Sequence, residues 1–233
     1  MADPSLALVV GANRGIGLAV VEEFLRHGWS VIATARKPDD ASLLKNLAAA
    51  NPGRVEIKAL DMTDTGQADA FARGLAGKQL DAVLVNGGVS GPGHMSADKA
   101  TEAEVGTLMF TNAVAPIRLA RALAGSVKEN TGVLAFTSSI MGSVSLNTDG
   151  YHELYRASKA ALNSLTRGLW PAVKDRGITL LTLHPGWVRT DMGGPSAPVG
   201  VEDSARGLVA VIEGERGKHH HAFIDFTGEA LAW

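Results

Sequence analysis

The glycine-rich segment Gly11-Ala12-Asn13-Arg14-Gly15-Ile16-Gly17 constrains the fold of this chain more than any other feature. It follows a short apolar run, 6–10, and precedes an amphipathic run, 16–27. Glycines allow positive φ angles and let backbone N–H groups approach a pyrophosphate, and a helix N-terminus favours negative charge. The spacing G-x-x-x-G-x-G is not the dinucleotide fingerprint G-x-G-x-x-G, so an ordinary glycine-rich turn is an alternative. The place of the segment between strand and helix favours cofactor binding.

Short apolar runs alternate with longer amphipathic runs along the whole chain. The short runs are continuous in Val, Leu and Ile, which is typical of parallel strands buried on both faces. We therefore predict one domain, residues 1–233, with a doubly wound α/β fold: a Rossmann-type parallel sheet of about seven strands with helices on both faces. The predicted strands are 6–10, 30–35, 55–60, 80–85, 132–137, 178–183 and 222–225, and the predicted helices are 16–27, 41–50, 65–75, 101–127, 152–174 and 202–212.

Composition excludes several classes of function. The chain has 233 residues, 45% hydrophobic and 20% charged, as expected for a soluble globular domain. A net charge of −2 gives no basic field for nucleic acid or an anionic membrane. The absence of cysteine excludes disulfides, thiolate metal sites and cysteine nucleophiles. No signal-peptide pattern and no membrane-spanning run is present, so we expect a soluble cytoplasmic protein without nucleic-acid or membrane partners.

The end of the second predicted strand indicates which cofactor is bound. An acidic residue about 20 positions after the glycine turn binds the ribose of NAD, but here Arg36 and Lys37 follow the strand. Arg14 could reach the same place, and a guanidinium fits phosphate oxygens. We predict NADP(H), with solvated loop charges as the alternative. Asp39 and Asp40 more plausibly cap the next helix.

Tyr155 and Lys159 are four apart on a predicted helix and so share a face. Tyrosine titrates at about 10, too high for efficient proton transfer at neutral pH, and a lysine cation within about 4–6 Å lowers that pKa. Such pairs are also common on ordinary helix surfaces. Ser138 and Ser139 follow a predicted strand and either hold a substrate carbonyl or serve as turn residues.

At these motifs the sequence resembles the classical short-chain dehydrogenase/reductase family over essentially its whole length. The resemblance implies that Tyr155, Lys159 and Ser139 are catalytic and that Asn112 supports a water-linked proton relay. Val10 stands where a threonine is usual, and glycine replaces alanine in Asn86-Gly87-Gly88. In the family, Asp61 would contact adenine and Thr190 would bond the nicotinamide amide. The predicted cofactor-binding residues, from the turn and the family motifs together, are Gly11, Asn13, Arg14, Gly15, Ile16, Gly17, Arg36, Asp61, Met62, Asn86, Gly87, Gly88, Tyr155, Lys159, Pro185, Gly186, Val188 and Thr190.

Segments 138–143, 155–163 and 184–192, with Asn147 and the final Trp233, are similar to the C-factor and sniffer-like carbonyl reductases. This resemblance implies an NADPH-dependent enzyme that interconverts a carbonyl and an alcohol. The apolar loops around the predicted site favour an apolar or aromatic aldehyde or ketone. A nucleotide-binding signalling or scaffold protein of the same fold is the alternative, although the complete Asn-Ser-Tyr-Lys set argues against it. The predicted substrate residues are Ser139, Met141, Tyr155, Trp187 and Met192.

The family resemblance also implies a homodimer or tetramer built on the long helices around Asn112 and Lys159. Leu162, Leu165 and Leu169 are more apolar residues than one catalytic face needs to bury. The sequence thus predicts that part of this helix surface is covered by a second copy of the chain, although packing in the core of one chain accounts for some of these apolar residues.

Two glycine- or proline-containing loops and several histidines also bear on the site. Loops 90–100 and 187–200 follow strands, and ligands of open α/β sheets bind outside the carboxyl ends of strands, so both loops should border the site. His94 and His152 are interpreted as loop residues beside it. His219-His220-His221 suggests a metal site, but alternate side chains before a strand point apart, so no metal is predicted and the role of the three stays open. Pro171 could kink the catalytic helix.

Overall fold

The computed structural model describes residues 4–233, and its centre is a seven-stranded sheet in the order β3-β2-β1-β4-β5-β6-β7. All neighbouring strands are parallel. The predicted doubly wound fold is confirmed. β1 and β2 have the predicted bounds, and the other strands begin or end one or two residues away. The strands are β1 (Leu6–Val10), β2 (Ser30–Ala35), β3 (Val55–Ala59), β4 (Ala82–Val85), β5 (Val133–Thr137), β6 (Thr179–His184) and β7 (His221–Asp225).

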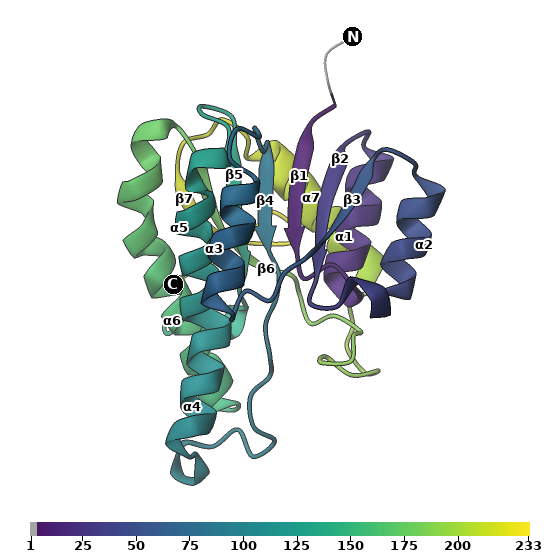
Figure 1. The fold of residues 1–233 in the computed structure, drawn as a ribbon. Helices are drawn as coiled ribbons and strands as arrows, with labels where there is room; N and C mark the ends of the chain where they lie inside the picture. Colours follow the sequence, from purple (N-terminus) through teal and green to yellow (C-terminus); the bar gives the residue numbers. More distant parts are fainter. Residues whose placement is uncertain (1–3) are drawn as a thin grey trace.

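Helices cover both faces of the sheet (Figure 1). One layer consists of α1 (Gly15–Arg26), α2 (Ser42–Ala50) and α7 (Val201–Gly214). The opposite layer consists of α3 (Thr65–Gly74), α5 (Ala115–Leu123) and α6 (Glu153–Val173). α4 (Glu102–Met109) extends beyond the carboxyl ends of the strands, at the lower end of the view.

Successive side chains of each strand pack alternately against the two helix layers. In β1, Ala7 and Val9 pack toward α1 and α7, while Leu8 and Val10 pack toward α3 and α5. Because successive side chains of a strand point to opposite faces, a strand covered on both sides needs apolar residues at every position. This explains why the strands appear in the sequence as continuous apolar runs.

The helix predicted over 101–127 is interrupted in the structure. α4 ends at Met109, a π-helical turn spans Phe110–Val114, and α5 then ends at Leu123 before a 3₁₀ turn. Pro116 lacks an N–H, so it cannot donate to the carbonyl oxygen of Asn112 four residues earlier. Proline is tolerated in the first turn of a new helix, which is where α5 begins. The interruption therefore follows from Pro116.

Two local expectations are also decided by the structure. Asp39 and Asp40 do not cap α2: they lie in a short 3₁₀ turn, and the residue before α2 is Ala41, which makes no capping side-chain bond. That expectation was wrong, because the 3₁₀ turn places an extra turn of chain between Pro38 and the helix. α6 runs through Pro171 and ends two residues later at Val173, so the proline lies in its last turn.

The direction of winding reverses between β1 and β4, which are neighbours in the sheet. Crevices at such switch points bind ligands at the carboxyl ends of the strands. The glycine turn follows β1 and Asn86-Gly87-Gly88 follows β4, so the two segments meet at this crevice.

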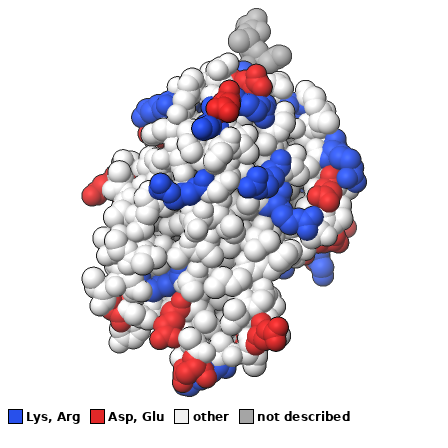
Figure 2. Space-filling view, turned by 90° about the vertical axis from the view of Figure 1, so that its left-hand side faces the viewer, with Lys and Arg blue, Asp and Glu red and all other residues white. Residues whose placement is uncertain are grey.

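Figure 2 views the molecule from the side on which α6 and β7 lie in Figure 1. Lys, Arg, Asp and Glu side chains are scattered over this face, and broad uncharged areas separate them. Within residues 4–233, no helix combines the length and apolar character needed to span a membrane.

Candidate active site

The glycine turn is held in place by close backbone contacts. Gly11, with φ 79°, donates its N–H to the hydroxyl of Thr34 at 3.1 Å. A Cβ atom at Gly17 would clash with the carbonyl oxygen of Gly11. Gly15 also has a positive φ of 54°, and α1 begins there without a side-chain cap on its first N–H groups. The uncapped N–H groups can bind a pyrophosphate, and the three glycines have no side chains that would keep it away. The turn therefore fits the predicted dinucleotide.

The segment after β4 packs directly against this turn. The side chain of Asn86 accepts a hydrogen bond from the hydroxyl of Thr137 at 2.9 Å and donates to the carbonyl oxygen of Gly11 at 3.4 Å. A Cβ at Gly87 would lie 3.0 Å from the terminal methyl of Met62. Met62 therefore occupies the space next to Gly87 in which the alanine methyl of the family motif would lie.

The two charged residues predicted to lie near the adenosine, Arg36 and Asp61, follow the neighbouring strands β2 and β3. Asp61 accepts hydrogen bonds from the N–H and hydroxyl of Thr63 at 2.9 and 2.6 Å. The hydroxyl bond is the main cause that holds the pKa of Asp61 below its usual value, and the charge of Arg36 contributes. Arg36 is exposed. Its charge thus acts on Asp61, the residue that the family resemblance assigns to adenine.

Arg14 is engaged differently from the prediction. Its guanidinium forms an ion pair with Asp191, and both side chains are largely exposed. Exposed ion pairs contribute about 0–1 kcal/mol, so a phosphate could replace the carboxylate at little cost. The sequence did not indicate Asp191, because the pair joins loops 177 residues apart.

The predicted catalytic side chains lie together at the carboxyl end of β5. Ser139 begins a 3₁₀ turn and accepts the N–H of Met141 at 3.1 Å, and its hydroxyl is close enough to Tyr155 to lower the pKa of the phenol. The Lys159 ammonium lies 5.7 Å from the Tyr155 ring centroid and donates to the carbonyl oxygen of Thr137 at 3.0 Å. A Cβ at Gly142 would meet Lys159 at 2.8–2.9 Å, so that glycine is what lets the turn approach α6.

Burial controls the protonation of this group. It raises the pKa of Tyr155 to about 12, against the lowering effect of the Ser139 hydrogen bond. It also lowers the pKa of Lys159 to about 8. The expected lowering of the tyrosine pKa by Lys159 is therefore not what this structure shows, because desolvation of the phenolate outweighs it. At neutral pH the phenol keeps its proton, and the buried ammonium keeps its charge.

Asn112 lies in the π-helical turn with no exposed surface. Its amide group exchanges two 2.8 Å hydrogen bonds with the backbone of Val89 and donates to the hydroxyl of Ser158 at 3.0 Å. These bonds tie the chain after β4 to α6. Since π turns often mark functional sites, the position agrees with the predicted relay role.

Both predicted loops reach the site. The N–H of Leu154 donates to the carbonyl oxygen of Met95 at 3.3 Å, which joins the first loop to the start of α6 beside Tyr155. The side chain of Thr190, in the second loop, lies 3.5 Å from a Cβ built at Gly15. The second loop thus extends to the glycine turn.

The remaining predicted residues occupy the same segments. Trp187 and Met192 are exposed apolar side chains, at 56% and 53%. Gly186 requires its glycine, with φ 86° and a Cβ position 2.9 Å from Phe226. The others follow β1 (Asn13, Ile16), β4 (Gly88) and β6 (Pro185, Val188).

The histidines that suggested a metal have separate partners. His219 bonds the carbonyl oxygen of Asn130 at 2.7 Å, and His220 bonds Glu215 at 2.5 Å. His221 lies 3.4 Å from the hydroxyl of Thr182. Within residues 4–233, no group of three His, Cys, Asp or Glu side chains could hold a metal ion.

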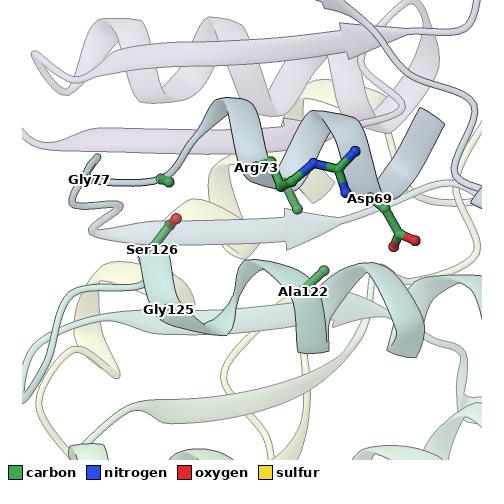
Figure 3. Close-up of a pocket in the computed structure, with 8 residues that line it drawn as sticks. Asp69, Arg73, Gly77, Ala122, Gly125 and Ser126 are labelled. Carbon is green, nitrogen blue, oxygen red and sulfur yellow. The ribbon is translucent and has the colours of Figure 1, made fainter. Parts of the chain in front are cut away.

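A hollow lies away from these residues (Figure 3). It has a volume of about 430 Å³ and lies between α3 and α5. Small residues such as Ala76, Gly77 and Ala122 line it, with Asp69 and Arg73 at its rim. It contains none of the predicted site residues, so we assign the chemistry to the crevice at the carboxyl ends of β1 and β4.

Comparison with known proteins agrees with the geometry. Residues 5–198 match the family model described as short chain dehydrogenase. The chain is 36% identical to C-signal of Myxococcus xanthus over 165 residues, which are 70% of this chain and 99% of that protein. It is 41% identical to a carbonyl reductase of Pseudomonas aeruginosa solved in complex with NADP, with a TM-score of 0.92 over 99% of this chain and 100% of that one. The carbonyl reductase Sniffer of D. melanogaster is 30% identical, with a TM-score of 0.86 and complete coverage of both chains.

Proposed function

The chain belongs to the short-chain dehydrogenase family of oxidoreductases, and from this premise we propose that it reduces an apolar or aromatic aldehyde or ketone to an alcohol with NADPH. The observation that carries the proposal is the position of the Lys159 ammonium, 5.7 Å from the centre of the Tyr155 ring, with the Ser139 hydroxyl close enough to act on the phenol. Ser139 follows β5, and Tyr155 and Lys159 lie in the first turns of α6, near a turn suited to a dinucleotide.

Each side chain has a role in the proposed reaction. A nicotinamide bound in this crevice would supply the hydride that the carbonyl carbon takes up. Ser139 orients the carbonyl oxygen, and Tyr155 donates its proton to that oxygen. A phenol with a pKa of about 12 is protonated at neutral pH, so it carries the proton that the carbonyl oxygen takes up in a reduction. Lys159 holds the ribose and places a positive charge near the phenol. Asn112 holds the relay water.

The cofactor proposal rests on charge at the adenosine end. Arg36 is exposed beside Asp61, and Arg14 lies in the glycine turn, so two guanidinium groups are available for a 2′-phosphate. The carbonyl reductase of Pseudomonas aeruginosa was crystallised with NADP, which supports the same choice here.

Exposed apolar side chains around the site favour an apolar substrate. Ile140, Val144 and Leu146 come from the segment between Ser139 and α6, and Trp187 comes from the second loop. Water-exposed apolar groups that gather at a site are typical of contacts for an apolar ligand. These residues, with Met141 and Met192, are our candidates for the substrate pocket.

The test is NADPH oxidation against a panel of carbonyls that ranges from small polar aldehydes to aryl ketones. We expect turnover, with the highest kcat/KM for the apolar aromatic members. If no carbonyl is reduced while NADPH binds tightly, the second candidate function is favoured. That candidate, a nucleotide-binding signalling protein with little turnover, is kept because C-signal is among the relatives.

We also propose a homodimer or tetramer built on the long helices around Asn112 (α4 to α5) and Lys159 (α6), in a single catalytic domain that acts in the cytoplasm. Fewer apolar side chains are exposed for this interface than the sequence suggested. Leu162 and Leu169 are buried in the core of one chain, and of the three leucines only Leu165, at 38% exposure, faces outward. Light scattering at micromolar concentration should show a mass of at least twice 24.2 kDa; a monomer would refute the assembly.

A further inference from the structure

The segment after β7 folds back along the edge of the sheet. The carboxylate of Asp225 accepts the N–H of Glu229 at 3.0 Å, which closes a turn. The N–H of Leu231 then donates to the carbonyl oxygen of Phe223 at 2.8 Å. Residues 226–233, which we call the return segment, therefore run antiparallel along β7.

Trp233 anchors the return segment by its ring. The ring centroid lies 4.8 Å from that of His221 and 5.3 Å from that of Phe223. The guanidinium of Arg167, on α6, lies over the ring at 5.1 Å. Aromatic pairs and cation–π contacts of this geometry each contribute favourably to packing. The ring is thus fixed between β7 and the catalytic helix.

The backbone of Trp233 holds a second element. Its carbonyl oxygen accepts hydrogen bonds from the hydroxyl and the N–H of Ser145, at 2.8 and 3.3 Å. The hydroxyl of Ser145 lies 3.2 Å from that of Ser143, which accepts the N–H of Leu146 at 3.1 Å. Trp233 is therefore bonded to the segment that joins Ser139 to α6.

The residues on either side of Ser145 are exposed and apolar. Val144 is 74% exposed and Leu146 is 42% exposed. Few contacts of their own hold such side chains, so their positions depend on the backbone between them. That backbone is tied to Trp233 on one side and to Ser143 on the other.

We propose that Trp233 is a positioning residue for substrate selectivity: through Ser145 it holds Val144 and Leu146 where the large apolar group of a carbonyl substrate binds. The proposal rests on the proposed carbonyl reduction. Trp233 touches neither the substrate nor Tyr155; it acts on the substrate through the backbone of residues 144–146.

Steady-state kinetics of three variants test the selectivity. Trp233→Ala should raise KM for a bulky aryl ketone about tenfold, while kcat and the constants for a small aldehyde stay as in the wild type. Trp233→Phe keeps an aromatic ring and should restore most of the lost affinity. Leu43→Ala removes an exposed apolar side chain on α2, at 57% exposure, and is the matched control without effect. An equal loss for both substrates would overturn the proposal, since it would indicate a general structural defect.

Amide hydrogen exchange tests the contact without any turnover. Exchange of a peptide that covers residues 143–150 should be faster in Trp233→Ala than in the wild type, and Ser145→Ala should have a smaller effect of the same kind. If exchange and selectivity are both unchanged, the positioning role is wrong even though carbonyl reduction stands. If the wild type reduces no carbonyl, the proposed function fails. Unchanged exchange in Trp233→Ala would then show that Trp233 does not hold residues 143–150 either. Faster exchange in that variant would show that it does hold them.

Discussion

The proposed cofactor side and the proposed substrate side of this site are built in opposite ways. On the cofactor side, Gly17 leaves no room for a Cβ next to Gly11, and the turn is bonded to Thr34. On the substrate side, Val144 and Trp187 expose 74% and 56% of their surface. Backbone atoms in close contact make the first surface, and side chains in open loops make the second.

The positive φ angles show the same difference. In the glycine turn they belong to glycines, Gly11 and Gly15, which adopt them without strain. In the substrate loops they include Met95 and His152, for which such angles are unfavourable. A pyrophosphate is the same in every dinucleotide and can be bound by a rigid backbone. Substrates differ, so side chains in adjustable loops suit them better. We therefore expect sharp effects of substitution on the first side and graded effects on the second.

The largest effect should come from the group between the two sides. Tyr155→Phe removes the proton donor but keeps the ring, so turnover should fall by about a hundredfold to ten-thousandfold with an unchanged Kd for NADPH. Tyr151→Phe, the same substitution at an exposed position, is the control and should retain activity. Steady-state kinetics and a fluorescence titration measure both; a Tyr155→Phe enzyme with wild-type turnover would contradict the assignment.

Because the charge of Lys159 is buried, the free energy of unfolding should depend on pH. Burial lowers its pKa from 10.5 to about 8, so between these values the unfolded chain binds more protons than the folded one. Stability should therefore rise with pH above about 8, by up to about 3 kcal/mol. Urea unfolding from pH 7.5 to 9.5 measures the rise, and Lys159→Met should abolish it. The same rise in that variant would show that another group titrates.

Gly17→Ala should test how tightly the cofactor side is packed. Its methyl would clash with the carbonyl oxygen of Gly11, which cannot move without shifting the turn. We expect a loss of about 1–3 kcal/mol in unfolding free energy, together with weaker NADPH binding. Gly106→Ala on α4 meets nothing within 4 Å and should slightly stabilise the chain. Equal thermal stability of the two variants would show that the glycine turn is not packed more tightly than an exposed helix.

Cofactor preference should respond to one side chain at the open rim of the cofactor side. Arg36→Asp repels a 2′-phosphate and offers an acceptor to ribose hydroxyls, so the preference for NADPH should shift toward NADH by about tenfold to a hundredfold. Arg206→Asp, an exposed arginine on α7, should leave it unchanged. Titrations with both cofactors at two salt concentrations measure this. Equal dissociation constants in the wild type would withdraw the NADP assignment.

The smallest effect should come from the substrate side. Leu146→Ala removes an exposed apolar side chain, so KM for an aryl ketone should rise by roughly twofold to fivefold with little change in kcat. A complete loss of activity would show that the loop is as strictly required as the glycine turn, and the comparison between the two sides would fail.

The sequence alone determined the sheet, its strands and the glycine turn, because these depend on local patterns. Burial on both faces leaves continuous apolar runs, and the turn requires glycine at Gly11 and Gly15 whatever surrounds it. The four-residue spacing of Tyr155 and Lys159 likewise places both on one helix face in any fold. These features were predictable because each concerns residues that are neighbours along the chain.

The tertiary structure alone decided which distant residues meet. Thr34 holds the glycine turn, Arg14 pairs with Asp191, and Ser145 bonds Trp233, each across a long stretch of chain. No periodicity encodes such pairs, since they follow from the order of strands in the sheet. The direction of the Tyr155 pKa shift belongs here too, because desolvation depends on everything packed around the phenol, whereas the spacing to Lys159 reports only one neighbour.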